Sequence, residues 1–278
     1  MLFLVIVPVY ATFTKLQNTA SICYQNSVLQ CLLTSPVVGE VLVGDGHVAE
    51  ALRSLHARIL PGEITDAADV RAAMGGDWAG GSVQDSLEYL TALRQAQQGG
   101  IAATTELQVE EQLMCMACGT VTRSRGQLAE LSIHFSSDAV VDLQRAVDEL
   151  VAEEPVDVTC EFCPGVMSLK STRLTNSPNM LVIHLMRATF DPVAGKSVKS
   201  SKKLDCPLRD LRLSGAVYDL HGTVEHLGVE PEGGHFAAHL RHRDTSEWYD
   251  VDDEQIRPCS ADDVITSNSY LLFYVKRS

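Results

Sequence analysis

The chain has few basic residues and no long apolar segment. Lys and Arg total 22 against 36 Asp and Glu, so the net charge is −14. This balance argues against nucleic acid as the main partner and suits a basic protein partner, because opposite fields speed and orient encounter. The opening apolar run, Leu2 to Val9, has eight residues and is far too short to cross a bilayer. We therefore expect no membrane partner.

The opening run also lacks the features of a secretory leader. It has no basic residues before the apolar stretch and no small-residue cleavage site. We expect Leu2 to Val9 to form a buried strand. The remaining composition, 45% apolar and 21% charged over 278 residues, is that of a soluble globular protein with one large domain or two small ones.

The chain has only eight cysteines, and four of them lie in closely spaced pairs in the sequence. Four of the eight cysteines form two C-x-x-C pairs, Cys115 with Cys118 and Cys160 with Cys163, with 41 residues between the pairs. Two such pairs suit tetrahedral ligation of one structural zinc ion by four thiolates. This pattern indicates a reducing compartment, the cytoplasm or the nucleus, more than a disulfide framework. The isolated cysteines, expected to be packing residues, are Cys31, Cys206 and Cys259.

The hydrophobic periodicity changes along the chain. Apolar residues recur at helical spacing after Cys23, then from Val48 to Ile59, and again in a segment that opens at Ser82 with the capping-box pattern "SVQD". From about residue 105, short β-prone runs surround one helix-like segment, "VVDLQRAVDELV", and the last hundred residues are mostly strands. This order predicts an α+β protein. The lysine-rich stretch 195–203, "GKSVKSSKK", is expected to be a solvated loop, with a nuclear-targeting signal as the alternative.

A candidate nucleophile lies at the start of the first expected helix. Ser21 is expected to be the N-cap, which puts Cys23 in the first turn, where the helix dipole and free amides favour a thiolate. Far downstream, His235 follows two glycines and is expected to begin a strand. Aspartates 250, 252 and 253 follow after a short hairpin, which can bring a carboxylate beside the imidazole. For each residue alone a packing role is the alternative, but together they form a permitted Cys-His-Asp arrangement.

Several segments, taken together, resemble the ubiquitin-specific protease family of papain-like deubiquitinating enzymes. "LQNTASICYQNSVLQCLL" is similar to the family's cysteine box and "VQDSLEYL" to its glutamine-aspartate segment. "CMAC" and "CEFC" resemble its zinc pairs, and "NMLVIHLMR" its central strand. "YDLHGTVEHLGVEPEGGHFAAHL", "WYDVDD" and "SYLLFYVKR" resemble its histidine box and C-terminal strands. These segments follow the family's order from residue 16 to 277.

The resemblance implies a role for each matched residue. Cys23 would be the nucleophile, His235 the general base and then the acid, and Asp252 the orienting carboxylate. Asp253 is the runner-up for that carboxylate, or it supports the oxyanion water. Asn18, five residues before the cysteine, would bind the oxyanion, with a turn residue as the alternative. The residues implied to contact the substrate are Gln84, Asp85, His226, Gly233 and Gly234; a helix cap for Asp85 and a structural role for His226 fit equally well.

The resemblance also implies a papain-like α+β hand in a single catalytic domain over residues 1–278. Its expected parts are a helical thumb at about 16–104, zinc-ribbon-like fingers at about 105–170 and an antiparallel β palm at about 171–278. The implied activity is thiol-dependent hydrolysis of the (iso)peptide bond after the C-terminal glycine of ubiquitin. The implied partners are ubiquitin and ubiquitinated proteins. A catalytically weak or inactive ubiquitin-binding module on the same fold is the alternative.

Two residues beside the nucleophile depart from the family pattern. Ala20 stands where glycine is usual, and if that position requires a positive φ, alanine costs about 1–2 kcal/mol. Ile22 stands where threonine is usual, which removes a hydroxyl. Neither change removes a catalytic group, so both bear on the level of activity and not on the family.

Overall fold

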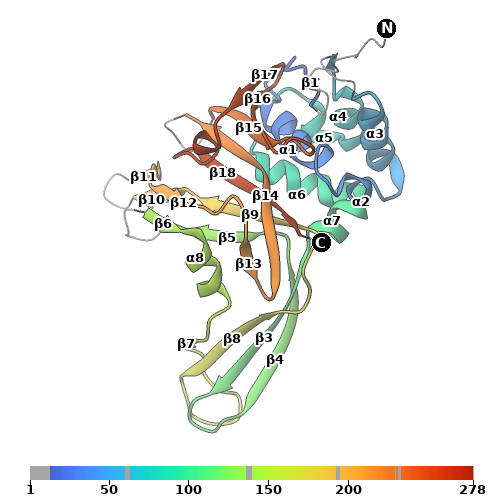
Figure 1. Cartoon of the computed structure of the whole chain (residues 1–278). Helices are drawn as coiled ribbons and strands as arrows, with labels where there is room; N and C mark the ends of the chain where they lie inside the picture. The colour runs from blue at the N-terminus through green and yellow to red at the C-terminus, as the bar shows by residue number, and fades with distance from the viewer. Residues whose placement is uncertain are drawn as a thin grey trace.

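The computed structural model describes residues 13–59, 63–135, 140–191, 195–228, 230 and 233–277. The strand expected at Leu2 to Val9 lies outside these ranges. The described chain forms a group of helices, a large sheet beside them, and a narrow second sheet that projects away from both (Figure 1). This confirms the predicted α+β class, and we call the three parts the thumb, the palm and the fingers.

The thumb consists of the helices that precede residue 106. They are α1 Cys23–Leu33, α2 Val38–Val41, α3 Gly46–Ala57, α4 Ala68–Met74, α5 Gly76–Ala79, α6 Ser86–Gln97 and α7 Gly100–Thr105. A short parallel pair, β1 Lys15–Leu16 with β2 Ile64–Thr65, links the chain before α1 to the chain after α3. Helix α6 begins at Ser86 and not at the expected Ser82, because Asp85 is its N-cap and accepts hydrogen bonds from the N–H groups of Leu87 and Glu88.

Helix α1 is enclosed on all sides. All eleven of its residues are buried, and it packs against β14, β15 and α6. Its polar side chains must therefore find partners inside the protein, because a buried polar group without a hydrogen bond is costly. Gln30 donates to the backbone oxygen of Thr14, and Asn26 donates to a carboxylate described below.

The palm is an eight-stranded sheet in the order β17–β16–β15–β14–β18–β9–β5, with β13 paired to β14. Its strands are β5 Leu131–His134, β9 Met180–Met186, β13 Leu211–Leu213, β14 Ala216–Leu227, β15 His235–Arg241, β16 Trp248–Asp252, β17 Gln255–Cys259 and β18 Ser269–Lys276. All neighbours run antiparallel except β5 and β9, which are parallel. A short 3-10 helix, η1 Ala261–Asp263, precedes β18.

Alternate residues of the palm strands belong to two separate cores. On β18, Leu271 and Phe273 join the core that contains the thumb helices, whereas Leu272 and Tyr274 join the core that contains helix α8, Leu143–Leu150. This period of two is that of a strand buried on both faces. The sheet is therefore held between the thumb on one face and α8 on the other.

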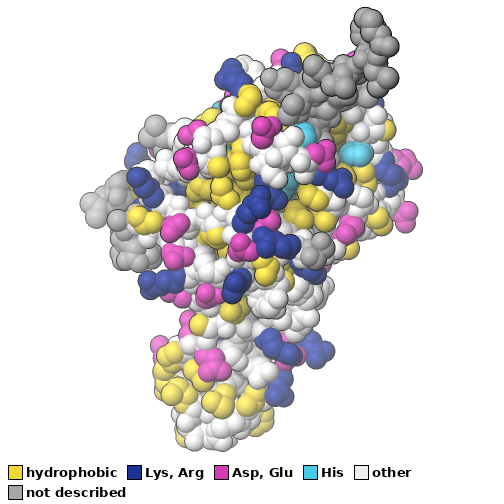
Figure 2. Space-filling view, viewed as in Figure 1, with side chains coloured by type: hydrophobic (Ala, Val, Ile, Leu, Met, Phe, Trp, Pro, Cys, Tyr) yellow, Lys and Arg dark blue, Asp and Glu magenta, His cyan; other side chains and the backbone are white. Residues whose placement is uncertain are grey.

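The fingers are a four-stranded sheet in the order β4–β3–β8–β7. The strands are β3 Leu107–Cys115, β4 Val121–Leu128, β7 Glu154–Val156 and β8 Ser168–Leu174. Every residue of β4 is exposed. At the far end of this sheet Met116, Phe162 and Val166 are 61–67% exposed, and Figure 2 shows apolar side chains gathered there. A sheet this small buries little apolar surface, so its tip needs another source of stability.

Two expectations about this region need correction. β5 and α8 fall inside the range expected for the fingers, but β5 pairs with β9 and α8 packs against β5 and β13, so both belong with the palm. Their buried apolar faces require a core, which the thin finger sheet does not provide. The stretch 195–203 is not a loop. It contains β11 Lys196–Lys199, paired with β10 Ala188–Asp191, and the start of β12 Lys203–Asp205, paired with β6 Val140–Asp142.

None of the described helices is long and apolar enough to cross a membrane.

Candidate active site and metal centre

The loop before α1 positions the candidate nucleophile. Cys23 lies in the first turn of the helix, as predicted, and is its first residue. The N-cap residue is Ile22, so the expected cap at Ser21 is wrong. Ser21 has a left-handed backbone with φ 57°. The side-chain oxygen of Asn18 accepts the N–H of Ile22 at 2.9 Å, which gives one free amide of the helix entrance a partner.

The two departures from the family pattern fit this loop. The positive φ lies at Ser21 and not at Ala20, so the condition for strain at Ala20 is not met. Ala20 lies against Gly81, where an added Cβ would be 2.4 Å from the Cβ of Ala20. The extra methyl group at position 20 is therefore accommodated because position 81 is glycine. Ile22 is fully buried and adds apolar packing beside the nucleophile.

The Cys23 thiol lies beside the start of β15. Its sulfur accepts the N–H of Phe236 at 3.4 Å, and only 5% of the residue is exposed. Burial raises the pKa of the Cys23 thiol; the Phe236 N–H lowers it to a smaller extent, and the Asp253 carboxylate raises it further. The helix start alone therefore does not produce a thiolate, and the thiol needs a base.

His235 and Asp252 form a direct pair. The imidazole Nε2 lies 2.6 Å from Oδ1 of Asp252. His235 is the first residue of β15 and Asp252 is the last residue of β16, so the hairpin register brings them together. Asp250 is paired with His239, four residues further along β15 and away from His235. The geometry selects Asp252 as the partner of the imidazole and leaves Nδ1 as the ring nitrogen available to the thiol.

Asp253 connects the palm to the loop before α1. One carboxylate oxygen accepts the amide of Asn18 and the other accepts the amide of Asn26, each at 2.7 Å. Burial raises the pKa of the Asp253 carboxyl, and the hydrogen bonds from Asn26 and Asn18 oppose that change. The runner-up carboxylate of the sequence analysis thus holds the candidate oxyanion residue in place.

Asn26 is a site residue that the sequence analysis did not assign. The signal for it was present in "YQNS", a polar run inside the first helix. Because that helix is buried on every side, a polar side chain within it must bind something specific. The Asn26 amide donates to Asp253 at 2.7 Å and, at 3.4 Å, to the backbone oxygens of Leu16 and Gln17.

The two residues expected at the glutamine-aspartate segment have local partners. Asp85 caps α6 through one oxygen, as the alternative interpretation predicted. It also lies beside Tyr270, whose pKa is raised by burial and then by the Asp85 carboxylate. Gln84 donates to the Ser82 hydroxyl at 3.1 Å. Contact of Asp85 or Gln84 with a substrate stays a prediction.

His226 and the two glycines support the chain that leads to His235. The imidazole of His226 stacks on Phe236, with ring centres 4.8 Å apart, and its Nε2 is hydrogen bonded to the carbonyl of Gly233. Gly234 has φ 97°, and an added Cβ there would lie 2.3 Å from the oxygen of Leu227. Both the turn and the close approach require glycine. A substrate contact by these three residues also stays a prediction.

The four paired cysteines converge at the fingertip. The Cys115 and Cys163 sulfurs are 3.6 Å apart, the Cys118 and Cys160 sulfurs are 3.8 Å apart, and all four lie within 4.8 Å of one another. Tetrahedral zinc with Zn–S bonds of about 2.3 Å requires sulfur–sulfur distances of about 3.8 Å, so the donor set fits this metal.

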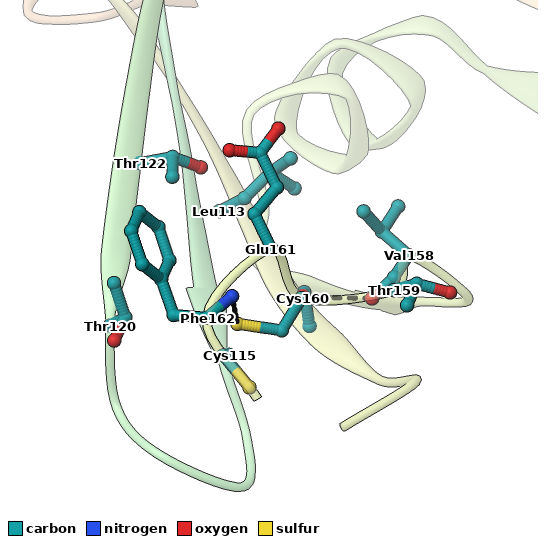
Figure 3. A pocket seen from close by; sticks show the side chains of 10 residues that line it. Leu113, Cys115, Thr120, Thr122, Val158, Thr159, Cys160, Glu161 and Phe162 are labelled. Carbon is teal, nitrogen blue, oxygen red and sulfur yellow. Dashed lines mark hydrogen bonds between the residues drawn. The ribbon is translucent and has the colours of Figure 1, made fainter. Parts of the chain in front are cut away.

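The backbone around the sulfurs is also arranged for a metal. The N–H of Phe162 points at the Cys160 sulfur, and the N–H of Gly165 at the Cys163 sulfur, each at 3.4 Å. An added Cβ at Gly165 would lie 3.0 Å from the Cys115 sulfur. Figure 3 shows Cys115, Cys160 and Phe162 among the residues that line a pocket at this tip.

A thiol at a helix start, an imidazole on the adjoining strand and a carboxylate that orients the imidazole are the groups that thiol-dependent hydrolysis requires. The family model described as ubiquitin carboxyl-terminal hydrolase matches residues 14–274, and the chain belongs to this family. The fold and the family confirm the resemblance found in the sequence.

Individual relatives agree with this assignment. The chain is 26% identical to human ubiquitin carboxyl-terminal hydrolase 17-like protein 10, over 95% of this chain and 56% of the relative. It is 30% identical to human ubiquitin carboxyl-terminal hydrolase 2, over 60% of this chain and 30% of the relative. The chain thus spans about half or less of these relatives. One chain of the solved SAGA DUB module Ubp8/Sgf11/Sus1/Sgf73 bound to monoubiquitin has the same fold, with a TM-score of 0.80 and 18% identity. The match covers 97% of this chain and 70% of the chain in that structure.

Proposed function

We propose that the chain is a cysteine-type deubiquitinase, a thiol protease that hydrolyses the (iso)peptide bond after the C-terminal glycine of ubiquitin. The observation that carries the proposal is the 2.6 Å pair of His235 and Asp252 at the start of β15, directly before the Phe236 N–H that contacts the Cys23 sulfur. Family membership supports ubiquitin and ubiquitinated proteins as partners. The net charge of −14 speaks against nucleic acid, and the cysteine pattern speaks for the cytoplasm or the nucleus.

The proposed reaction uses Cys23, His235 and Asp252. His235 accepts the thiol proton as the Cys23 sulfur attacks the glycine carbonyl, and Asp252 stabilises the resulting imidazolium and fixes its orientation. The imidazolium then gives its proton to the leaving lysine amine, which breaks the C–N bond. Water, deprotonated by the same imidazole, cleaves the thioester and releases the ubiquitin carboxylate. His235 must act as the base because burial keeps the free thiol protonated.

Asn18 is the oxyanion ligand in this mechanism. Its amide oxygen is held by the N–H of Ile22, and one of its two amide N–H groups is held by Asp253. The second N–H is directed by these two bonds and binds the oxygen that becomes negative during attack. Such a preorganised donor contributes about 3 kcal/mol to transition-state stabilisation.

Zinc has a structural role in the proposal. Cys115, Cys118, Cys160 and Cys163 would hold one ion, which supplies a crosslink at the tip of the fingers. Four sulfurs complete a tetrahedral shell and leave no open position for a substrate.

Turnover of a ubiquitin C-terminal fluorogenic amide, measured beside the affinity for ubiquitin, tests the proposed function. We expect Cys23→Ala to bind ubiquitin normally and to lose both hydrolysis and labelling by an electrophilic ubiquitin probe. Cys31→Ala is the matched control, because Cys31 is buried and burial raises the pKa of its thiol. A wild-type chain that binds ubiquitin without hydrolysing the amide would establish the binding-only module instead.

A further inference from the structure

One lysine of the 195–203 stretch is fixed against the strand that precedes the catalytic histidine. Lys199 is the last residue of β11, and its amine donates to the carbonyl of His226, to the carbonyl of Gly228 at 2.9 Å and to Oδ1 of Asn268 at 3.2 Å. A lysine amine has three N–H donors, so these three acceptors use all of them. This is a built contact, unlike a lysine on a solvated loop.

The acceptors lie where the chain turns toward His235. His226 is paired with Phe236 across β14 and β15, and Leu227 is paired with His235. Gly228 directly follows β14, and an added Cβ there would be 3.4 Å from the Cα of Gly234, the residue before His235. The Lys199 amine therefore holds the end of β14. The start of β15, with His235, packs against this same backbone.

The backbone next to Lys199 is held in turn by the side chain of Arg187. The buried guanidinium of Arg187 donates to the carbonyls of Ser200, Thr266 and Ser269 at 3.1, 3.2 and 2.6 Å. The charged groups that act on Lys199 are Arg187 and Glu225. Burial and then Arg187 lower the pKa of the Lys199 amine, while Glu225 raises it. The amine is thus held by neighbouring protein groups.

We propose that Lys199 is a positioning residue for His235: its amine fixes the end of β14, so that the imidazole stays paired with Asp252 at the start of the strand whose Phe236 N–H contacts the Cys23 sulfur. The proposal rests on the catalytic role of His235 in the proposed function. Removing the amine leaves the carbonyls of His226 and Gly228 without this donor, and the segment that carries His235 shifts. A displacement of about 1 Å in a catalytic group lowers a rate by up to about a hundredfold.

Alkylation of Cys23 by iodoacetamide across pH, followed by mass spectrometry, tests this without ubiquitin. The variants are Lys199→Met and Lys199→Arg. The matched control is Lys203→Met, which removes an exposed charge from the neighbouring strand β12. We expect Lys199→Met to react about tenfold more slowly at neutral pH, with a profile displaced to higher pH, since the imidazole no longer takes the thiol proton efficiently. Lys203→Met should follow the wild type, and Lys199→Arg should restore part of the rate.

Steady-state hydrolysis of the ubiquitin amide is the second measurement. For Lys199→Met we expect a fall in kcat of about tenfold with KM within about threefold of the wild type, as for a lost transition-state interaction. A lower melting temperature with an unchanged alkylation profile would overturn the proposal and leave Lys199 a purely structural residue. If Lys199→Met does not fold, Lys199→Gln replaces it, and a wild-type profile in that variant also overturns the proposal. If the wild type does not hydrolyse the amide, the proposed function fails, while the alkylation profiles still decide the role of Lys199.

Discussion

The side-chain amide of Asn18 donates a 2.7 Å hydrogen bond to Asp253, which lies 235 positions later in the chain. The same amide accepts the N–H of Ile22 through its oxygen. With a donor on one side and a carboxylate on the other, the orientation of the amide is determined by its partners. The loop before the nucleophile and the end of β16 are thereby fixed relative to each other.

We expect the hydrogen bonds that Asp253 accepts from Asn18 and Asn26 to affect the rate of hydrolysis. Asp253→Ala should lower kcat about 10- to 100-fold, because the oxyanion donor loses its orientation. Asn26→Ala should lower it severalfold through the same carboxylate, and the double variant should be no worse than Asp253→Ala. Asn179→Ala, which removes an amide bonded to Glu40 away from this site, is the control. A further loss in the double variant would show that Asn26 acts independently of Asp253.

The three acids after Trp248 should separate by role. Asp252→Ala removes the carboxylate that lies 2.6 Å from the His235 ring and should lower turnover well over tenfold. Asp250→Ala should be milder, because Asp250 is paired with His239. Hydrolysis of the ubiquitin amide and a thermal melt of each variant check this. A larger loss for Asp250→Ala with unchanged melting would reassign the carboxylate.

The pKa of the thiol predicts how a variant without the base behaves. Burial raises the pKa of Cys23 above that of an ordinary thiol, so in His235→Ala the sulfur is protonated at neutral pH and becomes reactive only as the pH rises through that raised pKa. We therefore expect iodoacetamide to alkylate Cys23 in His235→Ala slowly at pH 7, with a rate that still climbs above pH 9. The wild type should react faster near neutrality. A plateau near neutral pH in His235→Ala would contradict the role of His235 as the base.

Metal analysis of protein purified without added zinc should give about one zinc ion per chain. Cys160→Ser should lower both the zinc content and the melting temperature, by more than about 5 °C, because metal binding is coupled to folding of the site. Cys259→Ser, at an isolated cysteine, is the control. Chelation should weaken ubiquitin binding while leaving alkylation of Cys23 unchanged. A metal-free chain with folded fingers would refute the assignment.

The sequence predicts best where the signal is local or periodic. The helix at Cys23, the β-rich last hundred residues and the convergence of the two cysteine pairs are confirmed, because periodicity and C-x-x-C spacing report them directly. The N-cap of α6 is missed by three residues, because Asp85 and not Ser82 accepts the backbone N–H groups of Leu87 and Glu88.

Several contacts between side chains that are far apart in the chain could not be predicted from the sequence. Alternation along β16 cannot distinguish Asp250 from Asp252, and the choice depends on the register with β15, which is a property of the folded sheet. Lys199 looks like part of a solvated basic stretch, and only the folded chain brings its amine to the end of β14. The bond of Asn26 to Asp253 likewise joins residues 227 positions apart.

The chain between the two cysteine pairs includes parts of the palm, so the metal site can affect the stability of more than the fingertip. After Cys118 the chain runs along β4 of the fingers, adds β5 to one edge of the palm and forms α8 over the palm's second face. It then returns through β7 to Cys160, 42 positions after Cys118. An ion that joins the pairs therefore closes a loop that includes part of the palm. In a simple chain-entropy treatment, closing a loop of this length disfavours the unfolded chain by about 4 kcal/mol. Loss of such an ion would consequently lower the stability of β5 and α8 as well as that of the fingertip, because all three lie within the closed loop.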